Sequence, residues 1–151
     1  MVHDYFFQSA HIKILLFLVS VLSLSSPFYG QEVFQKQDSL LLLSDKKFEF
    51  SKEMESIAYA YQVMQWADNN NNSEFKAKSY YKIGRAMFSL EMNKSSLYFF
   101  NEVLQETYIK TDPILEVKVR ENLAINYLHN GWQDQYFVEL QKAENILDTL
   151  N

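Results

Sequence analysis

Two stretches of this chain, residues 77–110 and 117–150, carry similar residue types at the same offsets. The aligned pairs are Ile83 with Leu123, Gly84 with Ala124, Met87 with Tyr127, Phe100 with Leu140, and Val103 with Ala143. Most of these residues are apolar and recur every three or four positions, which is the spacing of one face of an α-helix. A repeated helical pattern indicates similar helix pairs stacked side by side, because each pair has an apolar flank that its neighbour covers. The repeat therefore predicts an all-α protein of stacked antiparallel helix pairs.

The composition agrees with a helical protein and excludes several kinds of chemistry. The 151 residues include only 3 Gly and 2 Pro, so few positions break a helix. Hydrophobic residues make up 48% of the chain, which is enough for a packed core. There is no Cys, and this excludes disulfides, thiolate catalysis, thiolate zinc sites and lipoprotein processing. The net charge of −5 has the wrong sign for a sequence-independent nucleic-acid binder.

The N-terminal segment, residues 1–30, resembles a secretory signal peptide. Residues 14–22 form an apolar run that is too short to cross a hydrocarbon core of ~30 Å at ~1.5 Å per residue. Pro27 then breaks the helix, and Gly30 precedes the polar Gln31. We therefore predict cleavage after Gly30 and an exported protein, periplasmic or secreted. An uncleaved membrane anchor and a buried core helix are the alternatives.

Apolar stripes predict helices along the rest of the chain. We expect a short leading helix or linker over residues 31–50, followed by a helical repeat domain over residues 51–151. The expected helices cover residues 38–48, 51–67, 73–91, 96–109, 113–129 and 133–150. The fifth of them is followed by Gly131, a residue type that often caps a helix C-terminus.

Capping signals mark three of the helix starts. Ser51 is a residue type favoured at the N-cap position. Asn71 stands three residues before Glu74, which is the spacing of a capping box. Asp112 is followed by Pro113, and proline is favoured at the first helical position because its missing N–H costs nothing there.

The repeated pattern resembles the tetratricopeptide repeat (TPR), in which an aromatic residue, Leu-Gly, Tyr, Ala, a second aromatic residue and Ala follow at set offsets. The residues at these offsets are Tyr80, Ile83, Gly84, Phe100, Val103 and Leu104 in the first copy, and Leu123, Ala124, Tyr127, Gly131 and Ala143 in the second. Met87, Ser96, Arg120 and Tyr136 depart from the pattern. The copies begin 40 residues apart instead of about 34, so we expect a longer second helix or a loop around residues 109–111. The resemblance implies a TPR-like α-α superhelix of about two and a half repeats.

The resemblance also implies a binding surface, because TPR domains take peptides in a concave groove lined by the first helix of each pair. The residues at the groove positions are Lys78, Tyr81, Arg85 and Phe88 in the first copy, and Lys118, Glu121 and Ile125 in the second. Cations and aromatic rings in such a groove suit an extended or helical peptide with acidic groups. The simpler alternative is that Tyr81 and Phe88 only touch the preceding helix. The Lys/Asn set of the family's chaperone-binding clamp is not reproduced.

Patterns typical of enzymes are missing from the sequence after Gly30. His129 is the only His in that part, and it lies near an expected helix C-terminus, where a positive charge is favoured. No zinc-binding His pair, nucleophile elbow or glycine-rich phosphate loop accompanies it. We therefore expect a protein that is not an enzyme and has neither a cofactor nor a metal ion.

Two functions follow from these expectations. The first is an exported scaffold or adaptor that binds a protein or peptide, with no nucleic-acid partner and no membrane span in the mature chain. The second is the sensor input region of a truncated bacterial regulator or histidine kinase, because a signal-like leader before degenerate TPR helices is similar to the front part of AraC-type regulators. A plain helical bundle without a groove is a third reading.

The last expected helix has apolar residues beside its main stripe. These residues are Phe137, Val138 and Ile146. We expect either a missing helix or a second copy of the chain to cover them, and the second alternative predicts a homo-oligomer formed through the C-terminal helix.

Overall fold

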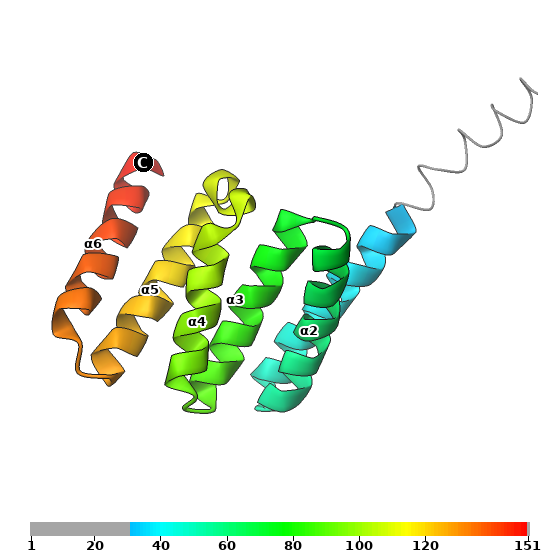
Figure 1. Cartoon of the computed structure of the whole chain (residues 1–151), viewed down its shortest axis with the longest axis horizontal. Helices are drawn as coiled ribbons and strands as arrows, with labels where there is room; N and C mark the ends of the chain where they lie inside the picture. The colour runs from blue at the N-terminus through cyan, green and yellow to red at the C-terminus, as the bar shows by residue number, and fades with distance from the viewer. Residues whose placement is uncertain (1–30, 151) are drawn as a thin grey trace, which may run out of the picture. The chain divides into compact units, whose positions relative to one another are not determined.

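The computed structural model describes residues 31–150, which form helices and no strand (Figure 1). The helices are residues 31–49, α2 (Glu53–Asn69), α3 (Ser73–Ser89), α4 (Asn93–Gln105), the short 3₁₀ helix η1 (Thr107–Thr111), α5 (Pro113–His129) and α6 (Gln133–Leu150). The predicted all-α class is confirmed. The predicted signal peptide, residues 1–30, lies outside the described residues. Within residues 31–150 no helix is long and apolar enough to cross a membrane.

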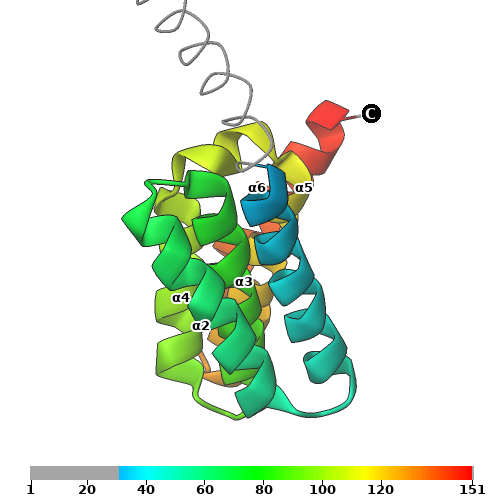
Figure 2. The same ribbon diagram turned by 90° about the vertical axis from the view of Figure 1, so that its right-hand side faces the viewer.

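The chain divides between Asp38 and Ser39 into two units, and the packing described here is that of the unit that begins at Ser39. In this unit each of α2 to α5 packs against the next labelled α-helix along the chain, and α3 also touches α5 (Figure 1). Figure 2 views the stack from the side of residues 39–69. The helices form three hairpins, whose first helices are residues 39–49, α3 and α5, and whose second helices are α2, α4 and α6.

The three hairpins share one register, which is set by the turn inside each of them. Ser51, Glu91 and Gly131 stand at equal intervals in the chain and all have positive φ angles, of 53°, 58° and 76°. In each turn the N–H of the next residue donates to the carbonyl five residues back, from Lys52 to Lys47, from Met92 to Met87 and from Trp132 to Tyr127. This is the Schellman arrangement, which ends a helix on a left-handed residue. The same cap therefore ends all three first helices, and a third hairpin precedes the two predicted copies.

This common register corrects two sequence-based predictions. Ser51 is not the N-cap of α2, because it is the left-handed residue that ends the preceding helix, and the N-cap position is Lys52. The hairpins begin before residue 51, where the start of the repeats was predicted. Residues 39–49 pack on α2 as the first helix of a hairpin, since Ser44 Oγ donates to the Ser56 carbonyl at 2.9 Å.

Small residues lie where the two helices of each hairpin approach each other. Position 44 and its equivalents 84 and 124 hold Ser, Gly and Ala, and all three are buried. In the middle hairpin Ser96 Oγ donates to the Gly84 carbonyl at 2.9 Å, at the position that matches the contact between Ser44 and Ser56. A Cβ added to Gly84 would lie 2.8 Å from the Phe100 ring. Close helix contact in the middle hairpin therefore requires glycine.

Of the other two predicted N-caps, one is confirmed and one lies one residue away from its predicted position. The Asp112 side chain accepts a hydrogen bond from the Leu115 N–H at 2.9 Å, and Pro113 begins α5, as predicted. The N-cap of α3 is Asn72 rather than Asn71, and it accepts from the Phe75 N–H at 3.0 Å. Asparagine at both positions made the two registers equally plausible from sequence.

The links between hairpins differ although their spacing is the same. A long α2 and a tight turn at residues 70–72 join the first hairpin to the second. The second hairpin has a shorter α4, which ends at Gln105 rather than near residue 109, and η1 then leads to α5. At the link between the two predicted copies, a longer helix or a loop was expected around residues 109–111, and the structure has a short 3₁₀ helix there instead of a longer α4.

The core runs through the hairpins from α2 to α5. Phe100, Ile83 and Val119 are fully buried, and Leu123 is nearly so. These residues belong to one cluster that also includes Ala60 of α2. Of the aligned residues, Ile83, Leu123, Phe100 and Val103 therefore share one core, whereas Leu140 and Ala143 of α6 are not part of that cluster.

Candidate functional site

The residues predicted to bind a peptide lie on two neighbouring first helices. Lys78, Tyr81, Arg85 and Phe88 belong to α3, and Lys118, Glu121 and Ile125 belong to α5. All seven are at least partly exposed. We call this surface the first-helix face, and the structure adds Asp45, Phe48 and Lys82 to it.

Arg85 is the centre of the part of this face that joins the first two hairpins. Its guanidinium lies over the ring of Phe48, 4.4 Å from the ring centroid, and 5.6 Å from the centroid of Tyr81. Its Nη1 lies 3.9 Å from Asp45 Oδ1, which is too long for a hydrogen bond. Lys82 Nζ donates to the other oxygen of Asp45 at 2.5 Å. Arg85 is thus within cation–π distance of two aromatic rings and has no close ion pair with Asp45.

Burial shifts the pKa values of two groups beside Arg85. Burial lowers the pKa of the Lys82 ammonium more than its hydrogen bond to Asp45 raises it. Burial likewise raises the pKa of the Tyr81 phenol, against the opposing effects of Arg85 and a hydrogen bond from Asn122. Both side chains are only partly exposed, so this part of the face is partly shielded from water.

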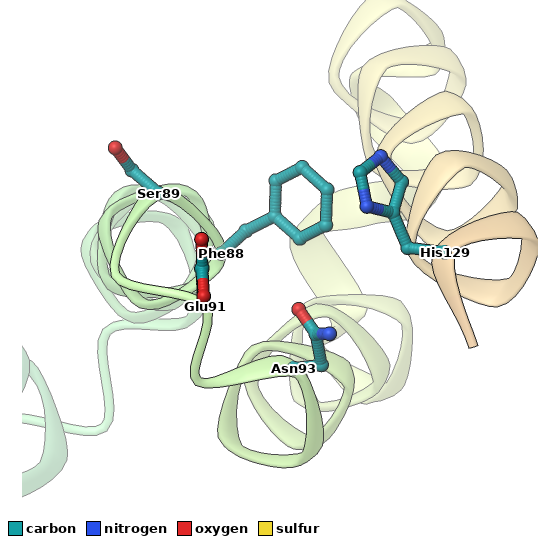
Figure 3. Close-up of a pocket in the computed structure, with 5 residues that line it drawn as sticks. All are labelled: Phe88, Ser89, Glu91, Asn93 and His129. Carbon is teal, nitrogen blue, oxygen red and sulfur yellow. The ribbon is translucent and has the colours of Figure 1, made fainter.

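Tyr81 and Phe88, the two predicted aromatic residues, do not contact the preceding helix alone. They also contact their own hairpin or the hairpin that follows. Tyr81 lies 6.2 Å from Phe100 of α4 between ring centroids, and its phenol is hydrogen-bonded to Asn122 of α5. Phe88 of α3 points toward His129 of α5 (Figure 3), with ring centroids 5.2 Å apart in an edge-to-face arrangement. Both residues therefore help to hold α3 and α5 together.

The predicted cations do not form one cluster. Lys78 Nζ pairs with Glu74 Oε1 at 2.5 Å and lies 5.6 Å from the centroid of the Tyr108 ring. Its ammonium group thus interacts with its own hairpin and with η1, which links that hairpin to α5. Lys118, with Glu121 and Ile125, is exposed on α5. Of the three cations, only Arg85 is held among aromatic rings contributed by two different first helices.

A pocket of about 330 Å³ lies at the end of the first-helix face near the hairpin turns. It is lined by Phe88, Ser89, Glu91, Asn93 and His129 (Figure 3). His129 is the last residue of α5, as its sequence position predicted. Within residues 31–150 no group of three or more His, Asp or Glu side chains is arranged to hold a metal ion.

Sequence reasoning missed Asp45 and Phe48 because the first hairpin was not recognised as a copy of the other two, and it missed Lys82 because that residue of α3 was not among the predicted groove positions. A sequence signal was present, since Asp45 precedes Arg85, and Phe48 precedes Phe88, by the same interval that separates Gly84 from Ala124. Extending the register of the two predicted copies upstream would have placed Asp45 and Phe48 on the face.

Neither a family model nor a curated protein matches the chain. The first-helix face offers guanidinium donors, aromatic rings and an exposed carboxylate at Glu121, which together suit a polypeptide with both acidic and apolar groups.

Proposed function

We propose that this protein is an exported, non-enzymatic TPR-like module that acts as a scaffold or adaptor and binds a protein or peptide through the first-helix face. Export rests on the leader-like residues 1–30, and the TPR assignment rests on the residue pattern of the copies. The single observation that supports binding most strongly is Arg85, within cation–π distance of Phe48 and Tyr81.

The recognition chemistry follows from how Arg85 is held. Its nearest carboxylate, on Asp45, is 3.9 Å away, so its N–H donors are not used up by a close ion pair. Contacts with two rings restrict the Arg85 side chain, which lowers the entropy cost of binding a carboxylate. A peptide carboxylate would bind it with two parallel hydrogen bonds, and the rings of Phe48 and Tyr81 would contact an apolar neighbour in the peptide.

The test is selection of binders from a displayed library of random peptides by the full chain. We expect enrichment of peptides with an acidic residue next to an apolar one. Arg85→Glu should weaken the binding of a selected peptide about tenfold or more, since it replaces a charge-assisted pair with repulsion. Lys94→Glu on α4 makes the same charge change at an exposed position outside the face and should leave binding unchanged. Equal loss in both variants, or no enrichment, would contradict the proposal.

The sensor input region of a bacterial transcription regulator or histidine kinase is the second candidate. It is favoured by the pocket beside Phe88 and His129, whose volume of about 330 Å³ is in the range of small-ligand sites. A thermal-shift screen of small molecules distinguishes the two functions. Hits that are lost in Phe88→Ala but kept in Arg85→Glu would favour the sensor.

A further inference from the structure

We propose that copies of this chain stack head to tail, with α6 of one copy packed against the helix of residues 39–49 of the next. The two ends of the described hairpins expose complementary halves of a junction that the chain already forms twice within itself. The argument rests on three positions in the common register of the hairpins.

The first position is on the second helix of each hairpin. Ile57 and Leu97 are equivalent, and both pack against the shared core, with Leu97 only 9% exposed. Phe137 is the third equivalent residue, and it is 63% exposed. The reason is that α3 covers α2 and α5 covers α4, whereas among the labelled elements α2 to α6 and η1 only α5 packs against α6. What covers this position in the other hairpins is the first helix of a following hairpin.

The second position is on the first helix of each hairpin. Ile83 and Leu123 are 0% and 1% exposed, in the same cluster as the residues of the preceding second helix. Their equivalent in the first hairpin is Leu43, which is 38% exposed. This position is buried where a preceding hairpin covers it. Within residues 39–150, the first hairpin thus has no preceding second helix and the last hairpin has no following first helix.

The third position pairs neighbouring first helices. At the first internal junction Asp45 accepts a hydrogen bond from Lys82. The residue equivalent to Asp45 in the last hairpin is Ile125, and the residue equivalent to Lys82 in the first hairpin is Leu42. These are 44% and 70% exposed. The positions that hold the ion pair at the first internal junction therefore hold two exposed apolar side chains at the two ends of the stack. These two side chains, Ile125 of one copy and Leu42 of the next, would meet in a junction between copies.

This complementarity favours head-to-tail stacking over a two-fold pair of α6 helices. A two-fold contact would cover Phe137 twice but would leave Leu42 and Leu43 in water. A head-to-tail contact covers Phe137 of one copy and Leu42 and Leu43 of the next, with the geometry of the internal junctions. The resulting pair still has one free head and one free tail. Such a contact does not close on itself, so assemblies grow with concentration.

The test is sedimentation velocity of the full chain over a wide range of concentrations. We expect the mass to rise past that of a dimer. Phe137→Glu removes the tail surface and Leu42→Glu removes the head surface, and each variant alone should be monomeric. A mixture of the two should form dimers and nothing larger, because each variant keeps one intact end. Tyr98→Glu changes an exposed aromatic residue on α4, outside both ends, and should assemble like the unaltered chain.

Circular dichroism checks that each variant keeps its helices, which is expected because both altered residues are largely exposed. A monomer at every concentration would overturn the proposal. Association that survives Leu42→Glu but not Phe137→Glu would identify a two-fold α6 pair instead. Association that survives both changes would place the contact elsewhere in the chain.

Discussion

The middle hairpin, α3 with α4, packs against neighbours on both sides, whereas the last hairpin, α5 with α6, packs against one neighbour within residues 39–150. The two hairpins have similar apolar patterns, but their burial differs. Phe100 is 0% exposed, and its equivalent Leu140 is only partly buried. The comparison shows that a helical stripe defines which face is apolar, while a neighbouring hairpin decides whether that face is buried.

The predicted stripe of α6 illustrates the difference. Its apolar residues at helical spacing are Tyr136, Leu140, Ala143, Leu147 and Leu150. Ala143 is 2% exposed, but Leu147 and Leu150 are 39% and 49% exposed. The apolar residues do recur at helical spacing along α6, but only those that face α5 are buried.

The largest expected effect comes from truncating the equivalent residues of the two hairpins. Phe100→Ala should lower the free energy of unfolding by about 3–5 kcal/mol, because it opens a cavity in a closed core. Leu140→Ala should lower it by about 1–2 kcal/mol, since the site is partly open to water. Urea unfolding followed by circular dichroism measures both. Equal losses would mean that the two hairpins do not differ in packing as described.

A second prediction concerns the closest helix contact. Gly84→Ala should destabilise the middle hairpin by about 1–3 kcal/mol through overpacking against Phe100, partly offset by the better helix propensity of alanine. The last hairpin already has alanine at the equivalent position 124, so Ala124→Gly should cost about 1 kcal/mol through propensity alone.

The control for this prediction is a double-mutant cycle. In a Phe100→Leu background the contact of the new Cβ with the Phe100 ring is gone, so Gly84→Ala should cost less than in the unaltered chain. If the cost of Gly84→Ala is the same in both backgrounds, the clash with Phe100 is not its cause.

The smallest expected effect is a dependence on alkaline pH that originates in the middle hairpin. Burial raises the pKa of Tyr81 above its ordinary value of 10.0. The folded state therefore holds the phenolic proton more tightly than the unfolded state. The resulting stabilisation is present below pH 10 and is lost as the pH rises through the pKa of the folded state. The free energy of unfolding, measured with urea, should be lower at about pH 11 than at pH 8, and this decrease should be smaller in Tyr81→Phe.

The decrease should not vanish in that variant, because burial also raises the pKa values of Tyr80 and Tyr108. The lowered pKa of Lys82 acts in the opposite direction, since its folded form releases the proton more readily and gains stability as the pH rises. An unchanged alkaline decrease in Tyr81→Phe would show that the phenol is not shielded as described.

Much of the fold was predictable because its signals are local. Asp112 with Pro113 predicted the start of α5, and the bounds of α6, Gln133–Leu150, were predicted without error. The core positions Ile83 and Leu123 followed from three- and four-residue spacing. The N-cap of α3 was displaced by one residue, because a run of asparagines contains more than one possible cap.

The candidate site was predicted only in part, because its partners are distant in sequence. Arg85, Tyr81 and Phe88 were identified through the repeat pattern. Asp45 and Phe48 were not, because their helix departs from the family pattern and was predicted only as a short leading segment. The ion pair between Lys78 and Glu74 also depends on side-chain geometry that residue types alone do not define.

The amino-acid sequence by itself determined the number of α-helices after residue 50 and their bounds to within a few residues, which of their faces are apolar and the interval at which the two predicted hairpins recur. These properties arise from hydrogen bonds and periodicity within a few residues. Only the tertiary structure decided that residues 39–49 complete a third hairpin, that Arg85 lies over the Phe48 ring, and that Phe137 is exposed where Leu97 is buried. The physical reason is that burial and pairing depend on which helix lies across the junction, and that helix belongs to the next hairpin along the chain.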